Sequence, residues 1–331
     1  MPLPVGPVTT TIGFFESKFI FLLSPGRPTY VAVMNSVLVL IAPMESEPLD
    51  GAIVAAVRDS LNGQGAASEA PRWLCPGRAC EIPFSGIPRP QAERSARTAL
   101  GERRLDFAAL PAESRRKKLL VADMDSTIVA GEMLDELADF AGVKERVAAI
   151  TARAMNGEIE YRDSLRERVA LLAGLGADTL EKTFARARLN PGAAALVATM
   201  RAHGAYTFLV SSGFRYFTRR IARLAGFDAD LGNDIEIADG KLTGRVIEPI
   251  LDKEVKRRAL NETAGRLGLA LSETLAVGDG ANDLPMIQDA GLGVALHPKP
   301  AVAAEAPAVI RHADLTALLY LQGYADDAFV G

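Results

Sequence analysis

Short apolar runs alternate with amphipathic helical segments in the second part of the chain, and this alternation limits the folds that the chain can adopt. The runs at 118–123, 206–212, 274–279 and 292–296 are rich in valine and leucine, and stretches with helical periodicity separate them. Strands that are apolar along their whole length are buried on both faces, as in a parallel sheet that helices cover on each side. The sequence therefore predicts an α/β fold with a doubly wound parallel sheet over residues 119–331.

A helical insertion interrupts the alternation after the first of these strands. Between about 132 and 190 the apolar residues recur with the spacing of helices alone. We expect this insertion to fold as a small cap above the carboxyl edge of the sheet, where such folds place their active sites. The segment 234–250 also differs, because alternating residues flank Asp239-Gly240, which is a hairpin signal.

The first part of the chain has a different order of elements. Residues 34–110 read as strand, helix, two strands, helix and strand, which predicts a small α+β domain of antiparallel strands under two helices. This pattern resembles the ACT domains, which often bind amino acids. The resemblance implies an amino-acid effector and a regulatory or dimerisation role, and a homodimer stays open. Residues 111–118 contain four basic side chains and are interpreted as a solvated linker.

Composition and charge exclude several classes of partner. The net charge is −4, so the chain lacks the positive field that would attract nucleic acid or an anionic membrane. No apolar stretch reaches the length of a membrane-spanning helix, and no signal peptide is evident. Cys75 and Cys80 are expected to be free thiols, as in the reducing cytosol, so a cytoplasmic location is expected. Residues 1–33 are rich in Pro, Thr and Gly and are expected to be a poorly ordered extension. Whether they belong to the native protein stays open.

Three of the predicted strands end in polar side chains. Because the carboxyl ends of parallel strands lie at one edge of a sheet, we expect these side chains to meet there, together with a lysine on the helix before the third strand. The set consists of Asp123 and Asp125, then Ser211, Ser212 and Gly213, then Asp279, Asn282 and Asp283, with Lys256 as the lysine.

The Asp-x-Asp pair has two simpler explanations. A calcium loop of the EF-hand type needs Asp or Asn at its fifth position, Gly at its sixth and Glu at its twelfth. Those positions hold Thr127, Ile128 and Leu134, so this explanation fails. Helix capping would explain Asp125 alone. Neither explains the second acidic cluster, and the ordered set therefore indicates an active site.

Three segments carry a resemblance to a known family. They are 123–138, 154–172 and 277–295, which read DMDSTIVAGEMLDELA, AMNGEIEYRDSLRERVALL and VGDGANDLPMIQDAGLGVA. Their order and wording resemble the haloacid dehalogenase superfamily of phosphotransferases and, within it, the phosphoserine phosphatases. The resemblance covers about residues 118–325 and implies a Rossmannoid sheet with a helical cap inserted after the first strand.

The two aspartates suit hydrolysis of a phosphate monoester. An aspartate can attack phosphorus and form an aspartyl-phosphate that water then cleaves. Asp123 is the predicted nucleophile, and Asp125 the predicted general acid and then general base. Two carboxylates beside a phosphate dianion call for a hard divalent cation, which we predict to be Mg²⁺. Asp123 and Asp279 would supply side-chain ligands, and the resemblance implies the backbone carbonyl of Asp125 as another.

The other polar residues suit binding of the phosphate group. Lys256 provides a point charge for phosphoryl oxygens, and N–H groups at the start of a helix favour an anion. The predicted substrate-binding set is Ser211, Ser212, Gly213, Lys256 and Asn282, with Asp283 in a supporting role.

The resemblance also implies that the cap recognises serine. Glu132 would bind the substrate ammonium, and Arg168 would bind its carboxylate, which suits a guanidinium. Met155 and Tyr161 would form an apolar lining. Two residues depart from the family pattern: Ser212 replaces a usual glycine, and Tyr161 stands where phenylalanine is common.

The activity that the resemblance implies is Mg²⁺-dependent hydrolysis of O-phospho-L-serine to L-serine and phosphate, the last step of serine biosynthesis. Two alternatives remain open. One is a phosphatase or phosphotransferase of the same superfamily that acts on another small phosphomonoester. The other is a regulatory protein that binds amino acids without catalysis.

Overall fold

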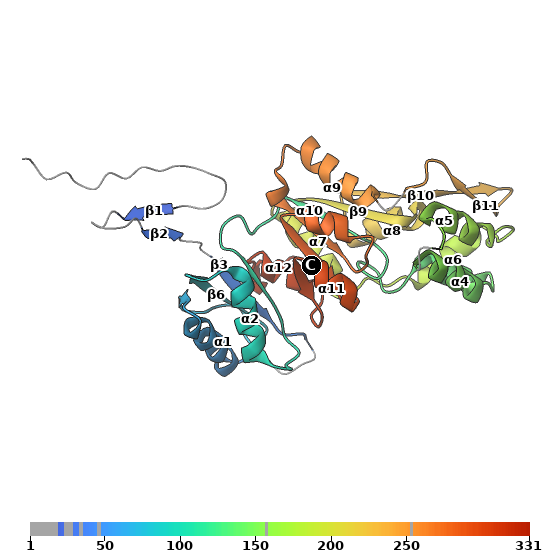
Figure 1. Ribbon diagram of the computed structural model, residues 1–331. Coiled ribbons are helices and arrows are strands. Elements are labelled where there is room, and N and C mark those ends of the chain that lie inside the picture. The colour runs from blue at the N-terminus through green and yellow to red at the C-terminus, as the bar shows by residue number, and fades with distance from the viewer. Residues whose placement is uncertain (1–18, 23–28, 33–35, 45–47, 156–157, 252–253) are drawn as a thin grey trace, which may run out of the picture. The chain divides into compact units, whose positions relative to one another are not determined.

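The computed structural model describes residues 19–22, 29–32, 36–44, 48–155, 158–251 and 254–331 (Figure 1). The chain divides into two compact units, Met1–Arg115 and Arg116–Gly331. Among the described residues, no helix is long and apolar enough to cross a lipid bilayer.

The first unit contains a five-stranded sheet and two helices. The sheet order is β4-β6-β3-β7, with β5 also paired to β6, and all the pairs are antiparallel. Its elements are β3 (Ser36–Ile41), α1 (Gly51–Gly63), β4 (Ala67–Ser68), β5 (Arg72–Cys75), β6 (Ala79–Ser85), α2 (Arg89–Leu100) and β7 (Asp106–Pro111). Leu38 and Leu40 of β3 share one hydrophobic core with Val57 of α1 and Ala96 of α2. Burial of these apolar side chains stabilises the packing of the helices on the sheet.

The resemblance of this unit to ACT domains stays a prediction. Most of residues 1–33 lie outside the described part of the chain. Within them, the structure describes β1 (Phe19–Leu22) and β2 (Thr29–Ala32), which pair antiparallel. Cys75 and Cys80 form no disulfide.

The second unit is built on a seven-stranded sheet in the order β11-β10-β9-β8-β12-β13-β14. Every neighbouring pair is parallel except β10 and β11. The strands are β8 (Leu119–Ala122), β9 (Tyr206–Phe214), β10 (Ala229–Ala238), β11 (Lys241–Ile247), β12 (Thr274–Gly278), β13 (Leu292–Leu296) and β14 (Ala308–Ile310). The predicted parallel sheet is therefore confirmed, and β14 adds a short strand that the sequence pattern does not predict.

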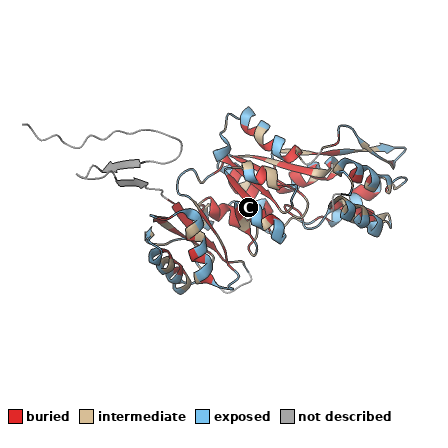
Figure 2. Cartoon of the chain, viewed as in Figure 1, coloured by how far each residue is buried: buried red, intermediate tan, exposed pale blue. Residues whose placement is uncertain are grey.

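Helices enclose this sheet. They are α7 (Ala193–Ala202), α8 (Arg215–Ala225), α9 (Val255–Arg266), α10 (Leu284–Asp289), α11 (Pro300–Glu305) and α12 (Ala317–Leu321). Leu119 and Val121 of β8 share a core with Leu260 of α9 and Ile287 of α10. Figure 2 shows the buried residues on the central strands and the exposed ones on the outer faces of helices such as α9. This burial on both faces explains why the strands are apolar along their length.

Four helices lie between β8 and α7 in the chain, and they form the cap. They are α3 (Met133–Phe140), α4 (Lys144–Met155), α5 (Tyr161–Ala170) and α6 (Asp178–Arg186). The β10–β11 hairpin contacts the cap, because Leu242 accepts a hydrogen bond from the N–H of Gly174 at 2.8 Å. The hairpin turns at Asp239-Gly240, where both residues have positive φ values of 50° and 70°, as a type I′ turn requires.

Candidate active site

Asp123 and Asp279 lie next to each other because they follow adjacent parallel strands. Asp123 comes directly after β8 and Asp279 directly after β12, at the point where the strand order reverses. The Asp123 N–H donates to the carbonyl of Val277 at 3.0 Å, which extends the pairing of β8 and β12 to Asp123. Carboxylate oxygens of Asp123, Asp279 and Asp283 all lie within 4.8 Å of one another.

The glycine-rich loop after β12 brings the Asp283 carboxylate next to those of Asp123 and Asp279. Asp283 is fully buried, and the N–H of Gly280 donates to its Oδ2 at 3.0 Å. A Cβ added to Gly278 would lie only 2.3 Å from Cγ of Asp283. The close packing of the carboxylate against this backbone therefore requires glycine at 278.

Lys256 is the buried cation of the cluster. It is the second residue of α9 and is 2% exposed. Its ammonium lies 2.7 Å from Oδ1 of Asp123 and 2.5 Å from Oδ1 of Asp283. Burial acts to lower the pKa of Lys256, but the two carboxylates outweigh it and raise the pKa above its ordinary value. Lys256 is therefore protonated, and it offsets part of the charge around Asp123.

One lysine leaves the three carboxylates under-compensated. Burial and then Asp283 raise the pKa of Asp123 well above its ordinary value, although Lys256 opposes this. Burial and then Asp283 also raise the pKa of Asp279 to about 6. Three ionised carboxylates and one ammonium would leave two negative charges, so this set of oxygen donors fits a hard divalent cation.

Asp125 is held so that one carboxylate oxygen faces the end of β9. Its Oδ1 accepts a hydrogen bond from the N–H of Met133 at 2.9 Å, and its Oδ2 accepts one from the hydroxyl of Ser211 at 3.3 Å. Burial, and then the carboxylate of Glu132, raise the pKa of Asp125 to about 7. A carboxyl group with such a pKa can both give and take a proton near neutral pH.

The last residues of β9 bring their backbone close to Asp125. The N–H of Gly213 donates to the Ser211 hydroxyl at 2.8 Å, and α8 begins at Arg215. A Cβ on Gly213 would approach Asp125 Oδ2 to 3.1 Å, so glycine allows this close approach. Ser212, between them, is partly exposed.

The cap brings Glu132, Arg168 and Tyr161 toward the same edge of the sheet. Glu132 lies just before α3, accepts a hydrogen bond from the Ser126 hydroxyl at 3.1 Å, and has its pKa raised, chiefly by burial. Burial lowers the pKa of Arg168, while the charge of Glu132 is among those that act to raise it. The Tyr161 hydroxyl donates to the Ser212 carbonyl at 3.0 Å, so its contacts are not purely apolar.

Two predicted residues are placed less closely. Asn282 is exposed on the loop before α10. Met155 ends α4, and its side chain lies outside the described part of the structure.

Two asparagines that the sequence does not single out contact the backbone of the site, the partly buried Asn190 and the buried Asn233. Asn190 donates to the carbonyl of Thr127 at 2.7 Å, which braces the loop after Asp125. Asn233 joins the Ser212 carbonyl to the N–H of Leu251, each at 2.7 Å. Asn233 could have been noticed as an amide in the middle of a predicted strand. A buried amide must find hydrogen-bond partners, so such a residue indicates a structural contact.

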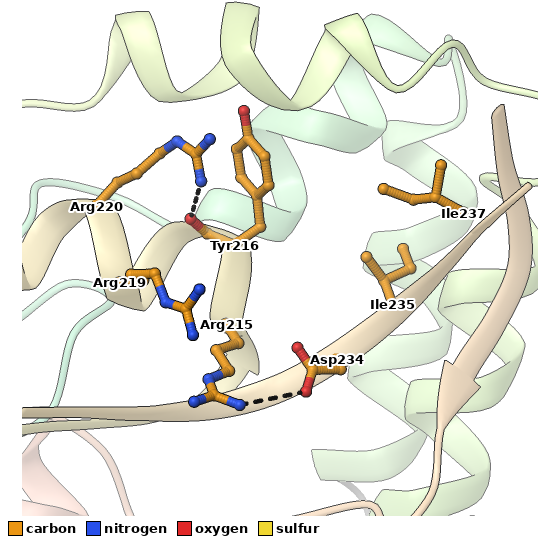
Figure 3. A pocket seen from close by; sticks show the side chains of 7 residues that line it. All are labelled: Arg215, Tyr216, Arg219, Arg220, Asp234, Ile235 and Ile237. Atoms are coloured by element: carbon orange, nitrogen blue, oxygen red, sulfur yellow. Dashed lines mark hydrogen bonds and ion pairs between the residues drawn. The ribbon is translucent and has the colours of Figure 1, made fainter. Parts of the chain in front are cut away.

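A separate cavity of about 230 Å³ lies between α8 and β10 (Figure 3). Two of the arginines that line it have partners. Arg215 forms an ion pair with Asp234 at 3.7 Å, and the Arg220 guanidinium lies 3.6 Å from the centre of the Tyr216 ring. Tyr216 in turn donates to Glu181 of α6 at 2.7 Å. These contacts connect α8 to the cap, and the cavity does not include the acidic cluster.

Comparison with known proteins places the second unit in a family. A model of the haloacid dehalogenase-like hydrolases matches residues 120–288. A curated phosphoserine phosphatase from Polaromonas sp. is 48% identical over 210 residues, which cover 62% of this chain and 89% of that protein. A phosphoserine phosphatase from Streptomyces coelicolor is 40% identical over 250 residues, which cover 75% of this chain and 61% of that protein.

Solved structures agree with this placement. A probable phosphoserine phosphatase from Vibrio cholerae, in unliganded form, has a TM-score of 0.71 at 32% identity and covers 89% of this chain and 88% of its own. A substrate-bound phosphoserine phosphatase complex has a TM-score of 0.58 at 38% identity and covers 62% of this chain and 98% of its own. The acidic edge, the parallel sheet and these matches together show that the chain belongs to the haloacid dehalogenase-like hydrolase family.

Proposed function

We propose that the protein is a phosphoserine phosphatase, which hydrolyses O-phospho-L-serine to L-serine and phosphate. One observation carries the proposal: Glu132 is close enough to raise the pKa of Asp125, and Arg168 is close enough to act on the pKa of Glu132, so a carboxylate and a guanidinium lie near the acidic pair. An acidic pair alone suits many phosphate esters. A carboxylate and a guanidinium beside it suit an ester that carries both an ammonium and a carboxylate.

The first chemical step is transfer of the phosphoryl group to Asp123. The Asp123 carboxylate attacks phosphorus in line with the seryl oxygen, a bond forms between Asp123 and phosphorus, and the bond from phosphorus to the seryl oxygen breaks. Asp125 gives its proton to that oxygen, so serine leaves as the neutral alcohol. Lys256, 2.7 Å from Asp123, balances negative charge at the phosphoryl group.

The second step returns the enzyme to its starting state. Asp125, now ionised, takes a proton from a water molecule as that water attacks the phosphorus of the aspartyl-phosphate. The bond between Asp123 and phosphorus breaks, phosphate is released, and Asp125 is protonated again. The Ser211 hydroxyl accepts a hydrogen bond from the Gly213 N–H at 2.8 Å and lies 3.3 Å from Asp125. We assign it to bind a phosphoryl oxygen in both steps, by turning its proton from Asp125 to the substrate.

We further propose Mg²⁺ as the cofactor. The side chains of Asp123 and Asp279 and the backbone carbonyl of Asp125 would hold it, and Asp283 supports them from below. When bound, the ion neutralises the charge of carboxylates and phosphate that would otherwise repel each other.

Metal removal is expected to abolish activity. Chelation with EDTA should stop phosphate release from O-phosphoserine, because the carboxylates of Asp123 and Asp279 would then repel the phosphate dianion. Added Mg²⁺ should restore the rate, and Ca²⁺ should restore little, because its looser coordination disturbs the in-line geometry. Full activity after exhaustive chelation would contradict the metal assignment.

The two cap residues are expected to control substrate choice. Arg168→Ala leaves the substrate carboxylate without its partner, which costs about 2–5 kcal/mol for a buried charge pair. That corresponds to a loss of roughly 30- to several-thousand-fold in kcat/KM. Phosphoserine should be affected, whereas phosphoethanolamine and p-nitrophenyl phosphate, which lack the carboxylate, should be hydrolysed almost as before.

Glu132→Ala provides the matched comparison. It should slow phosphoserine and phosphoethanolamine alike, and it should spare phosphoglycolate, which lacks the amine. Equal losses on every ester, in steady-state assays of both variants, would show that these residues support the fold or the chemistry and not recognition.

This activity would place the protein at the last step of serine biosynthesis in the cytoplasm. For the first unit, an amino-acid effector and a role in forming a homodimer remain proposals, supported by its α+β topology. Hydrolysis by a truncated chain that starts near Ser114 would show that the site residues beyond it suffice.

A further inference from the structure

Asn233 is a buried amide whose two ends bind two separate backbone segments of the site. It lies on β10, where the pairing with β9 shifts register, and is 2% exposed. Its Nδ2 donates to the Ser212 carbonyl at 2.7 Å, and its Oδ1 accepts from the N–H of Leu251 at 2.7 Å. These partners fix the orientation of the amide, because exchanging its oxygen and nitrogen would set oxygen against oxygen and N–H against N–H.

The Ser212 carbonyl also receives a hydrogen bond from the cap. The Tyr161 hydroxyl, at the start of α5, donates to it at 3.0 Å. A carbonyl oxygen has two lone pairs. One donor from the sheet and one from the cap therefore use both, and the second is present only while α5 lies over the end of β9.

The direction of this carbonyl sets the direction of an N–H on the other side of the turn. The Ser212 carbonyl and the Gly213 N–H belong to one peptide group, and in a trans peptide they point in opposite directions. With the oxygen held by Asn233 and Tyr161, the N–H faces away and donates to the Ser211 hydroxyl at 2.8 Å. That hydroxyl donates to Asp125 at 3.3 Å. The N–H thus fixes the position of the Ser211 hydroxyl, the group proposed to bind a phosphoryl oxygen.

The other end of Asn233 binds the backbone at Leu251, which comes shortly before the helix that carries Lys256 in the chain. Leu251 precedes α9, and Lys256 is the second residue of that helix. The Lys256 ammonium contacts Asp123 at 2.7 Å. A single amide therefore binds both the peptide group that fixes the Ser211 hydroxyl and the backbone N–H of Leu251.

We propose that Asn233 is a positioning residue for phosphoryl transfer, which rests on the proposed phosphatase function. Asn233 acts through the Ser212–Gly213 peptide group, because it binds the carbonyl and so orients the N–H. The Tyr161 hydroxyl binds the same carbonyl when the cap lies over the end of β9. The role concerns the phosphoryl group, so it is independent of which alcohol leaves. The role of Asn233 therefore differs from those of Glu132 and Arg168, which are proposed to bind the serine part of the substrate.

The test uses the full chain with Asn233→Asp, Tyr161→Phe and the double variant. Asn233→Asp keeps an acceptor for Leu251 but sets an oxygen against the Ser212 carbonyl. We expect kcat to fall about 10- to 100-fold on both O-phosphoserine and p-nitrophenyl phosphate, because a displaced Ser211 hydroxyl matters most where charge develops on the phosphoryl oxygens. The KM for phosphoserine should stay within about threefold of wild type, since ground-state contacts are mostly kept.

Tyr161→Phe removes only the cap donor and should lower kcat about 2- to 10-fold on both esters. In the double variant the losses should combine to less than their product, because both changes act on one carbonyl. Thr207→Val is the matched control. It removes a buried hydroxyl on the same strand β9 that bonds Asp228 at 2.9 Å, and it should leave kcat within about twofold of wild type.

Circular dichroism and thermal melting identify the folded variants. A folded Asn233→Asp protein with wild-type kcat on both esters would overturn the proposal, and so would a loss confined to phosphoserine or an equal loss in Thr207→Val. If Asn233→Asp does not fold, an unchanged kcat in Tyr161→Phe overturns it. Wild-type protein that hydrolyses neither ester would instead refute the proposed function, and this role with it.

Discussion

Asp123→Asn is expected to abolish turnover of every phosphate ester and to prevent formation of a phosphoenzyme. The amide keeps the size of the carboxylate but is a far weaker nucleophile, so no bond to phosphorus forms. It also removes one of the two negative partners of Lys256, whose ammonium lies 2.7 Å from Asp123 in a buried site. Acid quenching after mixing with labelled phosphoserine should trap a phosphoryl group on the wild-type protein and none on the variant.

Mass spectrometry of the trapped wild-type protein provides the decisive check of this assignment. The phosphoryl group should be found on Asp123. Its presence on another residue, or a variant with more than a trace of turnover, would show that a different group attacks phosphorus. Asn261→Ala serves as a control on α9, since the partly buried Asn261 amide contacts only Asp289 among the bonds described for it, at 3.2 Å.

Asp125→Asn is expected to slow both chemical steps by about 10²–10⁴-fold, the usual weight of a general acid and base. Unlike Asp123→Asn, it should still form a phosphoenzyme, slowly, because the nucleophile is intact. In the wild type the Asp125 carboxylate accepts a hydrogen bond from the Met133 N–H at 2.9 Å. The amide oxygen of the variant can accept the same bond, so the loop after Asp125 should keep its conformation. Rapid-quench measurement of the burst separates the two steps. A burst at the wild-type rate would contradict the role of Asp125 as the acid.

Asp125 also determines how the rate of phosphoenzyme formation should depend on pH. Burial, and then the neighbouring Glu132, raise the pKa of Asp125 to about 7. Protonated Asp125 is required for departure of serine, so the rate of phosphoenzyme formation should fall as pH rises through this value. The variant Asp125→Asn has no proton to lose there, and its residual rate should lack that fall. An identical alkaline decline in both proteins would assign it to another group.

The sequence predicts the acidic edge well because that edge depends on topology alone. Once alternating apolar strands are recognised as a parallel sheet, Asp123 and Asp279 must lie at the same edge, and the structure shows that β8 and β12 are neighbours there. The position of Lys256 at the start of α9 follows in the same way. The contact between Lys256 and Asp283 cannot be predicted from the sequence, because it depends on the tight loop at Gly278 and Gly280.

The supporting contacts are harder to predict because they depend on register and on the placement of the cap. Asn233 reaches the Ser212 carbonyl only because the pairing of β10 with β9 shifts between Leu231 and Asn233. A pattern of apolar residues carries no sign of that shift. The Tyr161 hydroxyl finds the same carbonyl only when α5 lies over the sheet, so sequence alone predicts an aromatic lining and not the hydrogen bond.

The most direct test of the proposed function is the substrate preference of the wild-type protein with Mg²⁺. Phosphate release should be measured for O-phosphoserine, phosphoethanolamine, phosphoglycolate and p-nitrophenyl phosphate. If Glu132 and Arg168 each pair with a substrate charge, kcat/KM for phosphoserine should exceed that for each other ester by at least about 30-fold. Equal values across the four esters, or a preference for one without the amino-acid group, would contradict the assignment to phosphoserine.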